Sequence, residues 1–131
     1  MKRTTREWVR KAEADYRATR KLHRGPDPLH DQSCFCCQQS AEKYLKALME
    51  DLGLAIPRTH LKDLEALLQP HYPSLARLRR GLVFLTRFAV GTRYPGGSAS
   101  KRETVAALRW ADKVRIAART LLGLPLGPPP K

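Results

Sequence analysis

The stretch from Cys34 to Glu50 constrains the fold of this chain more than any other part. Neither Gly nor Pro interrupts the sequence between Asp31 and Leu52. Apolar residues return there at spacings of three and four, the period of a helix face turned toward a core: Cys37, Ala41, Tyr44 or Leu45, Leu48 and Leu52. The opposite face is polar. The stretch therefore predicts the central part of a long helix over residues 28–52, which Gly53 ends.

Glycine, proline and capping residues divide the rest of the chain into further helices. A Gly-Pro pair ends a first helix over residues 4–23, and Thr59 is placed to cap a short helix over residues 60–69. Leucines at spacings of three and four, in a row that Ala89 continues, predict another helix over residues 74–88. Ser100 and Glu103 have the spacing of a capping box, which opens a last helix that Gly123 ends.

No segment shows the alternation that is typical of a strand. We therefore expect an all-α fold, an antiparallel up-and-down four-helix bundle with one additional short helix, over residues 1–123. The Pro-rich residues 124–131 are expected to form a flexible tail. At 131 residues and 42% hydrophobic composition, the chain is long and apolar enough for one domain with its own core.

Cellular location and cofactors follow from what the sequence lacks. No apolar run reaches the roughly 20 residues that span a bilayer, and the basic N-terminus has no apolar segment behind it, so we expect a cytoplasmic protein without a membrane partner. Three cysteines within four positions, Cys34, Cys36 and Cys37, cannot form a disulfide framework. We expect them to pack as small apolar side chains, and we expect no metal site and no cofactor.

The charge is large and uneven. The formal net charge is +13, and residues 66–102 contain no Asp or Glu. That acid-free span carries seven basic residues, Arg87 and Arg93 among them, and residues 3–24 add eight more. This balance favours an anionic partner, either nucleic acid, nucleotide or an acidic protein. The alternative is an arginine-rich surface that serves only solubility.

Three motifs, taken together and in order, resemble those of HEPN domains. They are residues 38–47 (Gln-Gln-Ser-Ala-Glu-Lys-Tyr-Leu-Lys-Ala), the Thr59-His60 pair followed by leucines to position 68, and residues 92–96 (Thr-Arg-Tyr-Pro-Gly). The resemblance covers about residues 5–122. It implies a bundle of about five helices that dimerises, and a role in prokaryotic toxin–antitoxin or defence systems, often beside a small nucleotidyltransferase. Many HEPN proteins are metal-independent ribonucleases, and others only bind nucleotide or RNA.

The ribonuclease branch of this family uses an Arg followed, four to six residues later, by a His near the start of the last helix. The Arg binds phosphate, and the His acts as acid and base for attack by the ribose 2′-hydroxyl. Arg93 stands at the position of that Arg, but no His follows it anywhere in the chain. His60 is the remaining acid–base candidate, and the alternative is that it only helps to start the short helix.

The resemblance also suggests which residues contact phosphate. Lys43 and Lys46 on the long helix are candidates, together with Arg93, Tyr94 and Arg87. A structural interpretation stands beside each of them. Lys46 forms a favourable helical pair with a Glu four residues earlier. Tyr94 and Arg93 lie on a stiff Tyr-Pro turn, where they would either meet an anion or tie the loop down.

These observations lead to one expected function and two alternatives. We expect a nucleotide- or RNA-associated homodimeric module of a toxin–antitoxin or nucleotidyltransferase-linked system, without the Arg-to-His ribonuclease pair and with a nucleotidyltransferase as candidate partner. The first alternative is a metal-independent endoribonuclease toxin that uses Arg93 and a displaced His60. The second is a purely structural protein-interaction module. Residues 75–88 and the last helix are the candidate dimer face.

Overall fold

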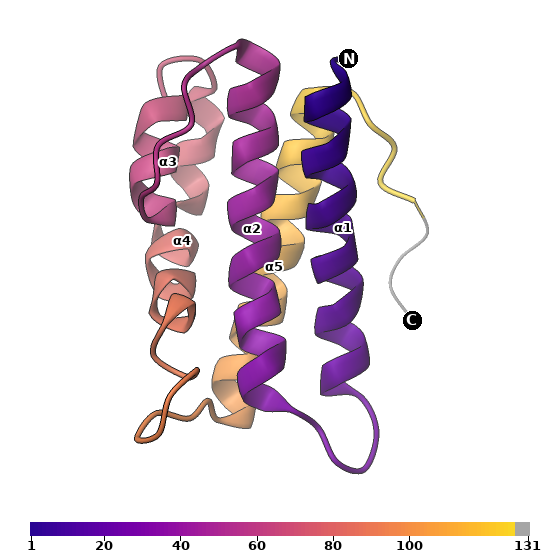
Figure 1. Ribbon diagram of the computed structural model, residues 1–131, viewed down its shortest axis with the longest axis vertical. Coiled ribbons are helices and arrows are strands. Elements are labelled where there is room, and N and C mark those ends of the chain that lie inside the picture. The colour runs from indigo at the N-terminus through magenta and orange to yellow at the C-terminus, as the bar shows by residue number, and fades with distance from the viewer. Residues whose placement is uncertain (128–131) are drawn as a thin grey trace.

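The computed structural model describes residues 1–127, and the regular secondary structure within them is entirely helical. The elements follow the chain in this order (Figure 1): α1 (Arg3–His23), α2 (His30–Leu52), α3 (Leu61–Leu68), η1 (Pro73–Leu78), α4 (Arg79–Thr86), η2 (Arg87–Ala89) and α5 (Lys101–Leu122). The described residues contain no strand, so the all-α prediction is confirmed. None of these helices is both long and apolar enough to cross a membrane.

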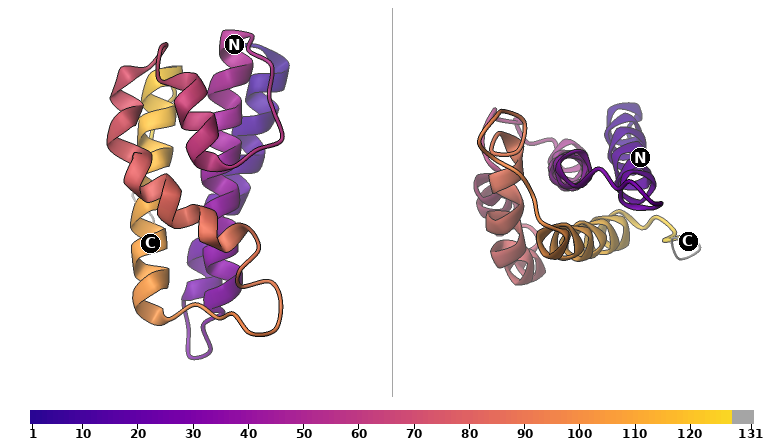
Figure 2. Two further views of the ribbon diagram at one scale, coloured as in Figure 1. Left: turned by 90° about the vertical axis from the view of Figure 1, so that its left-hand side faces the viewer. Right: turned by 90° about the horizontal axis from the view of Figure 1, so that it is seen from below.

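Helix α2 lies between α1 and the α3–η2 segments, and α5 packs against a third side of it (Figure 2). The face that was predicted to be inward is buried, from Cys37 through Leu48, whereas Leu52 is only half-buried. Ala47 and Met49 are buried as well, because α3 and η2 cover a second side of the helix. The polar face of α2 is therefore narrower than the sequence suggested.

The segment predicted as one helix over residues 74–88 is helical but not uniform. It consists of the 3₁₀ turns η1 and η2 at either end of the short α-helix α4. Its leucines are buried as expected, but Phe88 rather than Ala89 completes the buried stripe after Leu85. A 3₁₀ turn has three residues per turn, so the position three residues after Leu85 faces the core. The regular four-helix arrangement stays a prediction.

One glycine brings α4 unusually close to α5. A Cβ atom at Gly81 would lie 2.0 Å from Cε3 of Trp110, so the indole ring of α5 rests directly on the backbone of α4. Any larger residue at position 81 would force the ring or the helix to move. Gly81 therefore fixes the distance between these two helices.

The helix ends confirm part of the capping predictions. Ser100 Oγ accepts a hydrogen bond from the Glu103 amide at 3.0 Å, and the Glu103 carboxylate accepts one from the Ser100 amide at 3.1 Å, which is a complete capping box. Gly53 and Gly123 end α2 and α5 in the left-handed region, with φ of 74° and 72°. Thr59 does not cap α3: its hydroxyl donates to the Asp63 carboxylate, and His60 is the N-cap residue.

The predicted tail follows α5, and four of its eight residues are described. Leu124 packs against the core, and the carbonyls of Pro125 and Leu126 accept hydrogen bonds of 2.6 Å from Arg119 and Arg115. Residues 128–131 lie outside the described residues. The flexibility predicted for residues 124–131 stays a prediction.

Candidate functional site

The loop between η2 and α5 is tightly folded and is tied to the start of α2. Gly97 lies against the loop's own beginning, since a Cβ atom there would be 1.9 Å from the carbonyl oxygen of Gly91. Near the other end of the loop, the amide of Ala99 donates a 2.6 Å hydrogen bond to Oδ1 of Asp31, in the first turn of α2. These contacts set the height of the loop above α2.

A pocket of about 270 Å³ opens between this loop and α2, and we call it the Arg93 pocket. It is lined by Asp31, Gln32, Phe35, Thr92 and Arg93. The Arg93 guanidinium carbon lies 5.0 Å from the centre of the Phe35 ring, and one of its nitrogens donates a 3.5 Å hydrogen bond to the carbonyl of Ala89. Of these lining residues, only Arg93 was among the candidate phosphate contacts, and the three that α2 contributes were not.

The Arg93 pocket combines four kinds of recognition chemistry in a small space. It offers a cation, a carboxylate, a side-chain amide and an aromatic face. The hydroxyl of Thr92 is buried and has no hydrogen-bond partner among the described residues, so it is free to donate to a bound group. Such a set suits a ligand that has a flat ring, hydrogen-bonding edges and an anionic group.

Tyr94 and Arg87 lie near the pocket but do not line it. Tyr94 stands at the outer side of the loop with 60% of its surface exposed, and its ring centre is 5.8 Å from the Arg93 guanidinium. Arg87 instead pairs with Glu103 at 3.4 Å and lies over the Phe84 ring. The hydrogen bond from the Ser100 amide, aided by Arg87, lowers the pKa of Glu103 from its ordinary value. Arg87 therefore fastens η2 to the start of α5.

Lys43 and Lys46 lie elsewhere, along the seam between α1 and α2. Lys43 Nζ is 2.5 Å from the carboxylate of Asp15 on α1, and both side chains are largely buried. Lys46 Nζ is 3.3 Å from Glu42, the helical pair foreseen from the sequence, and lies 5.4 Å from the Trp8 ring centre. Both lysines thus have structural partners, and their contact with phosphate stays a prediction.

His60 lies apart from the other predicted site residues. It is exposed at the start of α3, where its carbonyl accepts the amide hydrogen bonds of Asp63 and Leu64. Within the described residues, no hydrogen bond or ion pair of its side chain is found. The structure therefore does not bring Lys43, Lys46, His60 and Arg93 to one pocket. It does give His60 the helix-starting position that the sequence offered as the alternative.

Comparison with known proteins identifies the family and the fold of this chain. The sequence model of the HEPN domain matches residues 5–121. The chain belongs to the HEPN domain family. Among solved structures, the crystal structure of ST0689, an archaeal HEPN homologue, is similar with a TM-score of 0.72 and 21% sequence identity, covering 93% of this chain and 99% of that one. At this identity the similarity concerns the HEPN fold alone. No curated protein matches this HEPN chain.

Proposed function

We propose that this HEPN-domain protein binds nucleotide or RNA at the Arg93 pocket, as a homodimeric cytoplasmic module of a toxin–antitoxin or nucleotidyltransferase-linked system. The observation that carries the proposal is the placement of Arg93 over Phe35, beside Gln32 and Asp31, in an open pocket. The system and the nucleotidyltransferase partner are suggested by the family. The binding chemistry is suggested by the pocket itself.

A nucleotide fits the groups of the pocket one by one. Each base has a π-face that stacks on an aromatic ring, which contributes about 1–3 kcal/mol per base. Phe35 offers such a ring on α2, and the exposed Tyr94 offers a second one on the loop. The amide of Gln32 and the carboxylate of Asp31 can read base edges or ribose hydroxyls. Arg93 can then turn from the ring to a phosphate, which it binds through two parallel hydrogen bonds.

Binding is favoured over cleavage because of the groups that line the pocket. Cleavage through the ribose 2′-hydroxyl needs a proton acceptor of suitable pKa within hydrogen-bond reach. The lining residues include no histidine, and His60, the N-cap residue of α3, is not among them. The endoribonuclease alternative is tested by incubating labelled RNA with the protein in a chelator. Cleavage that disappears in His60→Ala would establish it in place of the binding role.

The binding role is tested with a fluorescein-labelled single-stranded RNA of about twelve nucleotides, followed by fluorescence anisotropy. Arg93→Ala is expected to weaken binding about tenfold, since it removes both a charge and a stacking partner. Arg80→Ala is the matched control, because Arg80 is exposed on α4 and has no ion pair among the described residues. Equal affinities of wild type and Arg93→Ala would contradict the proposal.

The homodimer is proposed to form through the outer side of α4 and η2. Two large apolar side chains here are more than half exposed, Val83 of α4 at 51% and Val90, the residue that follows η2, at 60%. Burial of such side chains against a second copy would remove them from water. Val83→Asp is expected to shift light-scattering mass toward the monomer, while Ser74→Asp, exposed on η1, leaves it unchanged. A wild-type protein that is monomeric throughout would refute the dimer.

A further inference from the structure

An ion-pair network joins α1 to α5 on the side of the molecule away from the Arg93 pocket. Arg115 of α5 donates two hydrogen bonds to the carboxylate of Glu13 on α1, at 2.8 and 3.0 Å. Arg119 lies 3.7 Å from the same carboxylate, and the Tyr44 hydroxyl of α2 donates to it as well. Burial alone would raise the pKa of Glu13, but these hydrogen bonds and charges outweigh it and lower the pKa. Glu13 is therefore fully engaged by its neighbours.

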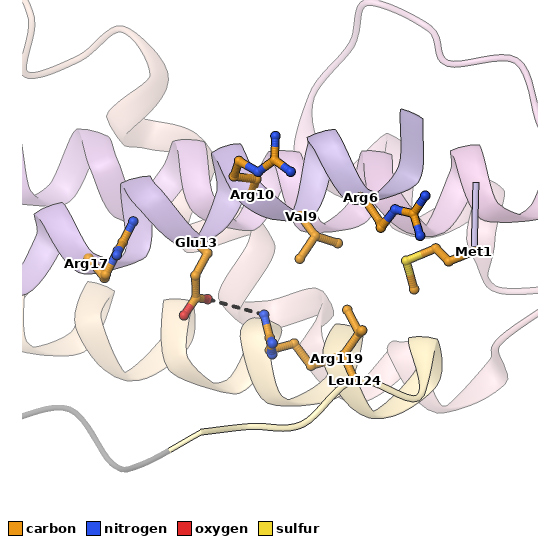
Figure 3. A pocket seen from close by; sticks show the side chains of 8 residues that line it. All are labelled: Met1, Arg6, Val9, Arg10, Glu13, Arg17, Arg119 and Leu124. Carbon is orange, nitrogen blue, oxygen red and sulfur yellow. Dashed lines mark ion pairs between the residues drawn. The ribbon is translucent and has the colours of Figure 1, made fainter. Parts of the chain in front are cut away.

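A groove of about 330 Å³ opens next to this network, and we call it the arginine groove. Its apolar lining comes from Met1, Val9 and Leu124. Figure 3 shows the charged lining, which is Arg6, Arg10, Glu13 and Arg17 from α1 and Arg119 from α5. Glu13 is the one carboxylate among these described lining residues, and it is already paired. The groove therefore carries a net positive charge.

The three α1 arginines form a row of available charges. Arg6, Arg10 and Arg17 are spaced by four and seven residues, so they lie on one side of the helix and span about 16 Å. All three are exposed, and no ion pair or side-chain hydrogen bond of theirs is found within residues 1–127. They differ in this from Arg115 and Arg119, which are held by Glu13.

The exposed side of α5 carries a second set of positive charges. Arg102, Arg109 and Lys113 are spaced by seven and four residues, and all are exposed. A second hollow, lined by Lys101, Arg102, Val105, Ala106 and Arg109, lies along the same helix. Positive charge therefore follows two helices rather than gathering around one point. A surface of this kind attracts an extended polyanion more strongly than a single small anion.

The deeper donors of the groove are already occupied. Arg119 and Arg115 donate to the carbonyls of Pro125 and Leu126, so the segment after α5 closes the groove from that side. An inserted peptide would have to displace this segment, whereas a polyanion that crosses the outer arginines would not. Guanidinium groups also bind phosphate through two parallel bonds and stack on bases.

We infer that the arginine groove binds the phosphate backbone of single-stranded RNA, as a site separate from the Arg93 pocket. The inference rests on the proposed association with RNA, but it uses other residues. It assigns Arg6, Arg10 and Arg17 to successive backbone contacts. A strand that also reaches α5 would continue toward Arg109 and Arg102.

The test compares two triple variants that lose the same net charge. In the first, Arg6, Arg10 and Arg17 become Ala; in the control, the exposed Arg58, Arg77 and Arg80 become Ala. The affinity for a labelled single-stranded RNA is measured by anisotropy over a range of salt concentrations. The groove variant is expected to bind about tenfold or more weakly at about 0.1 M salt, with its salt slope reduced by about two, because each lost phosphate contact removes about 0.7. The control keeps the wild-type slope.

Each outcome bears on the inference separately from the proposed function. Equal losses in both triple variants would mean that total charge alone acts, and would overturn the groove. A loss in Arg93→Ala without one in the groove variant would overturn the groove and leave the pocket intact. If the wild type does not bind RNA but binds polyglutamate through the three arginines, the partner is an acidic protein. That result would contradict RNA binding at both the arginine groove and the Arg93 pocket. Circular dichroism melts of the variants check that each remains folded.

Discussion

The Arg93 pocket and the arginine groove are built from the same residue type but in opposite ways. In the pocket, a single arginine on a glycine-rich loop is placed over the first turns of α2, and its position depends on local backbone folding. In the groove, several arginines stand on two straight helices, and a shared carboxylate holds those helices together. The comparison teaches that a loop places one cation accurately, whereas helices provide rows of them.

The largest effect is expected from a substitution that removes the ion-pair network beside the arginine groove. Glu13→Gln removes the negative charge between Arg115 and Arg119, and the Arg115 side chain is only 9% exposed. Loss of one partner from a largely buried ion pair leaves an uncompensated charge, so we expect a loss of about 2 to 3 kcal/mol in the free energy of unfolding. Urea denaturation followed by circular dichroism measures it.

Glu7→Gln is the matched control for this prediction. Glu7 pairs with Arg3 at 3.8 Å on the same helix, but both side chains are mostly exposed. Exposed pairs of this kind contribute little, so the control is expected to lose less than about 0.5 kcal/mol. Equal losses in the two variants would show that the Glu13 network does not hold α1 to α5.

The second prediction concerns a substitution that opens the loop of the Arg93 pocket. Gly97→Ala would place a methyl group where the carbonyl oxygen of Gly91 lies, so the loop must open. We expect a loss of about 1 to 2 kcal/mol in stability, together with the loss of the Arg93 contribution to RNA binding. The affinity of the arginine groove should remain. Ser98→Ala, one residue further along the loop, is the control, and unchanged RNA binding in Gly97→Ala would separate the loop from the pocket.

The smallest expected effect is the pH dependence of the stability that Glu13 contributes. The pKa of Glu13 is lowered in the folded protein, so its carboxylate stabilises the fold above its ordinary pKa of 4.5, and this contribution is lost as the pH falls through the lowered value. The difference in unfolding free energy between wild type and Glu13→Gln should therefore shrink between about pH 5 and pH 3. A difference that stays constant over this range would contradict the assignment.

The sequence predicted the parts of the molecule that local pattern determines. The buried face of α2, the capping box at Ser100 and the glycine ends of two helices follow from spacing within a few residues, and the structure confirms them. The broken segment around α4 was missed, because a run of leucines at helical spacing does not reveal a switch to 3₁₀ turns. Gly81 acts through Trp110 of α5, which is distant in sequence.

The same distinction, between local pattern and contacts distant in sequence, applies to the candidate sites. Arg93 was singled out because it lies in a short motif, but Phe35 was not, since no pattern in the sequence brings this part of α2 to that loop. The Glu13–Arg115 contact joins residues 102 positions apart, so no periodicity signals it. Lys43 was grouped with Arg93 by resemblance. Its bond to Asp15 depends on how α1 packs, which a single sequence does not disclose.

The contact between Trp110 and Gly81 also allows tryptophan fluorescence to report on the packing of α4 against α5. The chain has two tryptophans, and they report on different places: Trp110 rests on the α4 backbone, while Trp8 lies beside Lys46 at the α1–α2 seam. In a Trp8→Phe variant, the fluorescence emission wavelength of the remaining indole follows the separation of α4 from α5 alone. The same indole would sense a second copy that settles on the outer side of α4, without any attached dye.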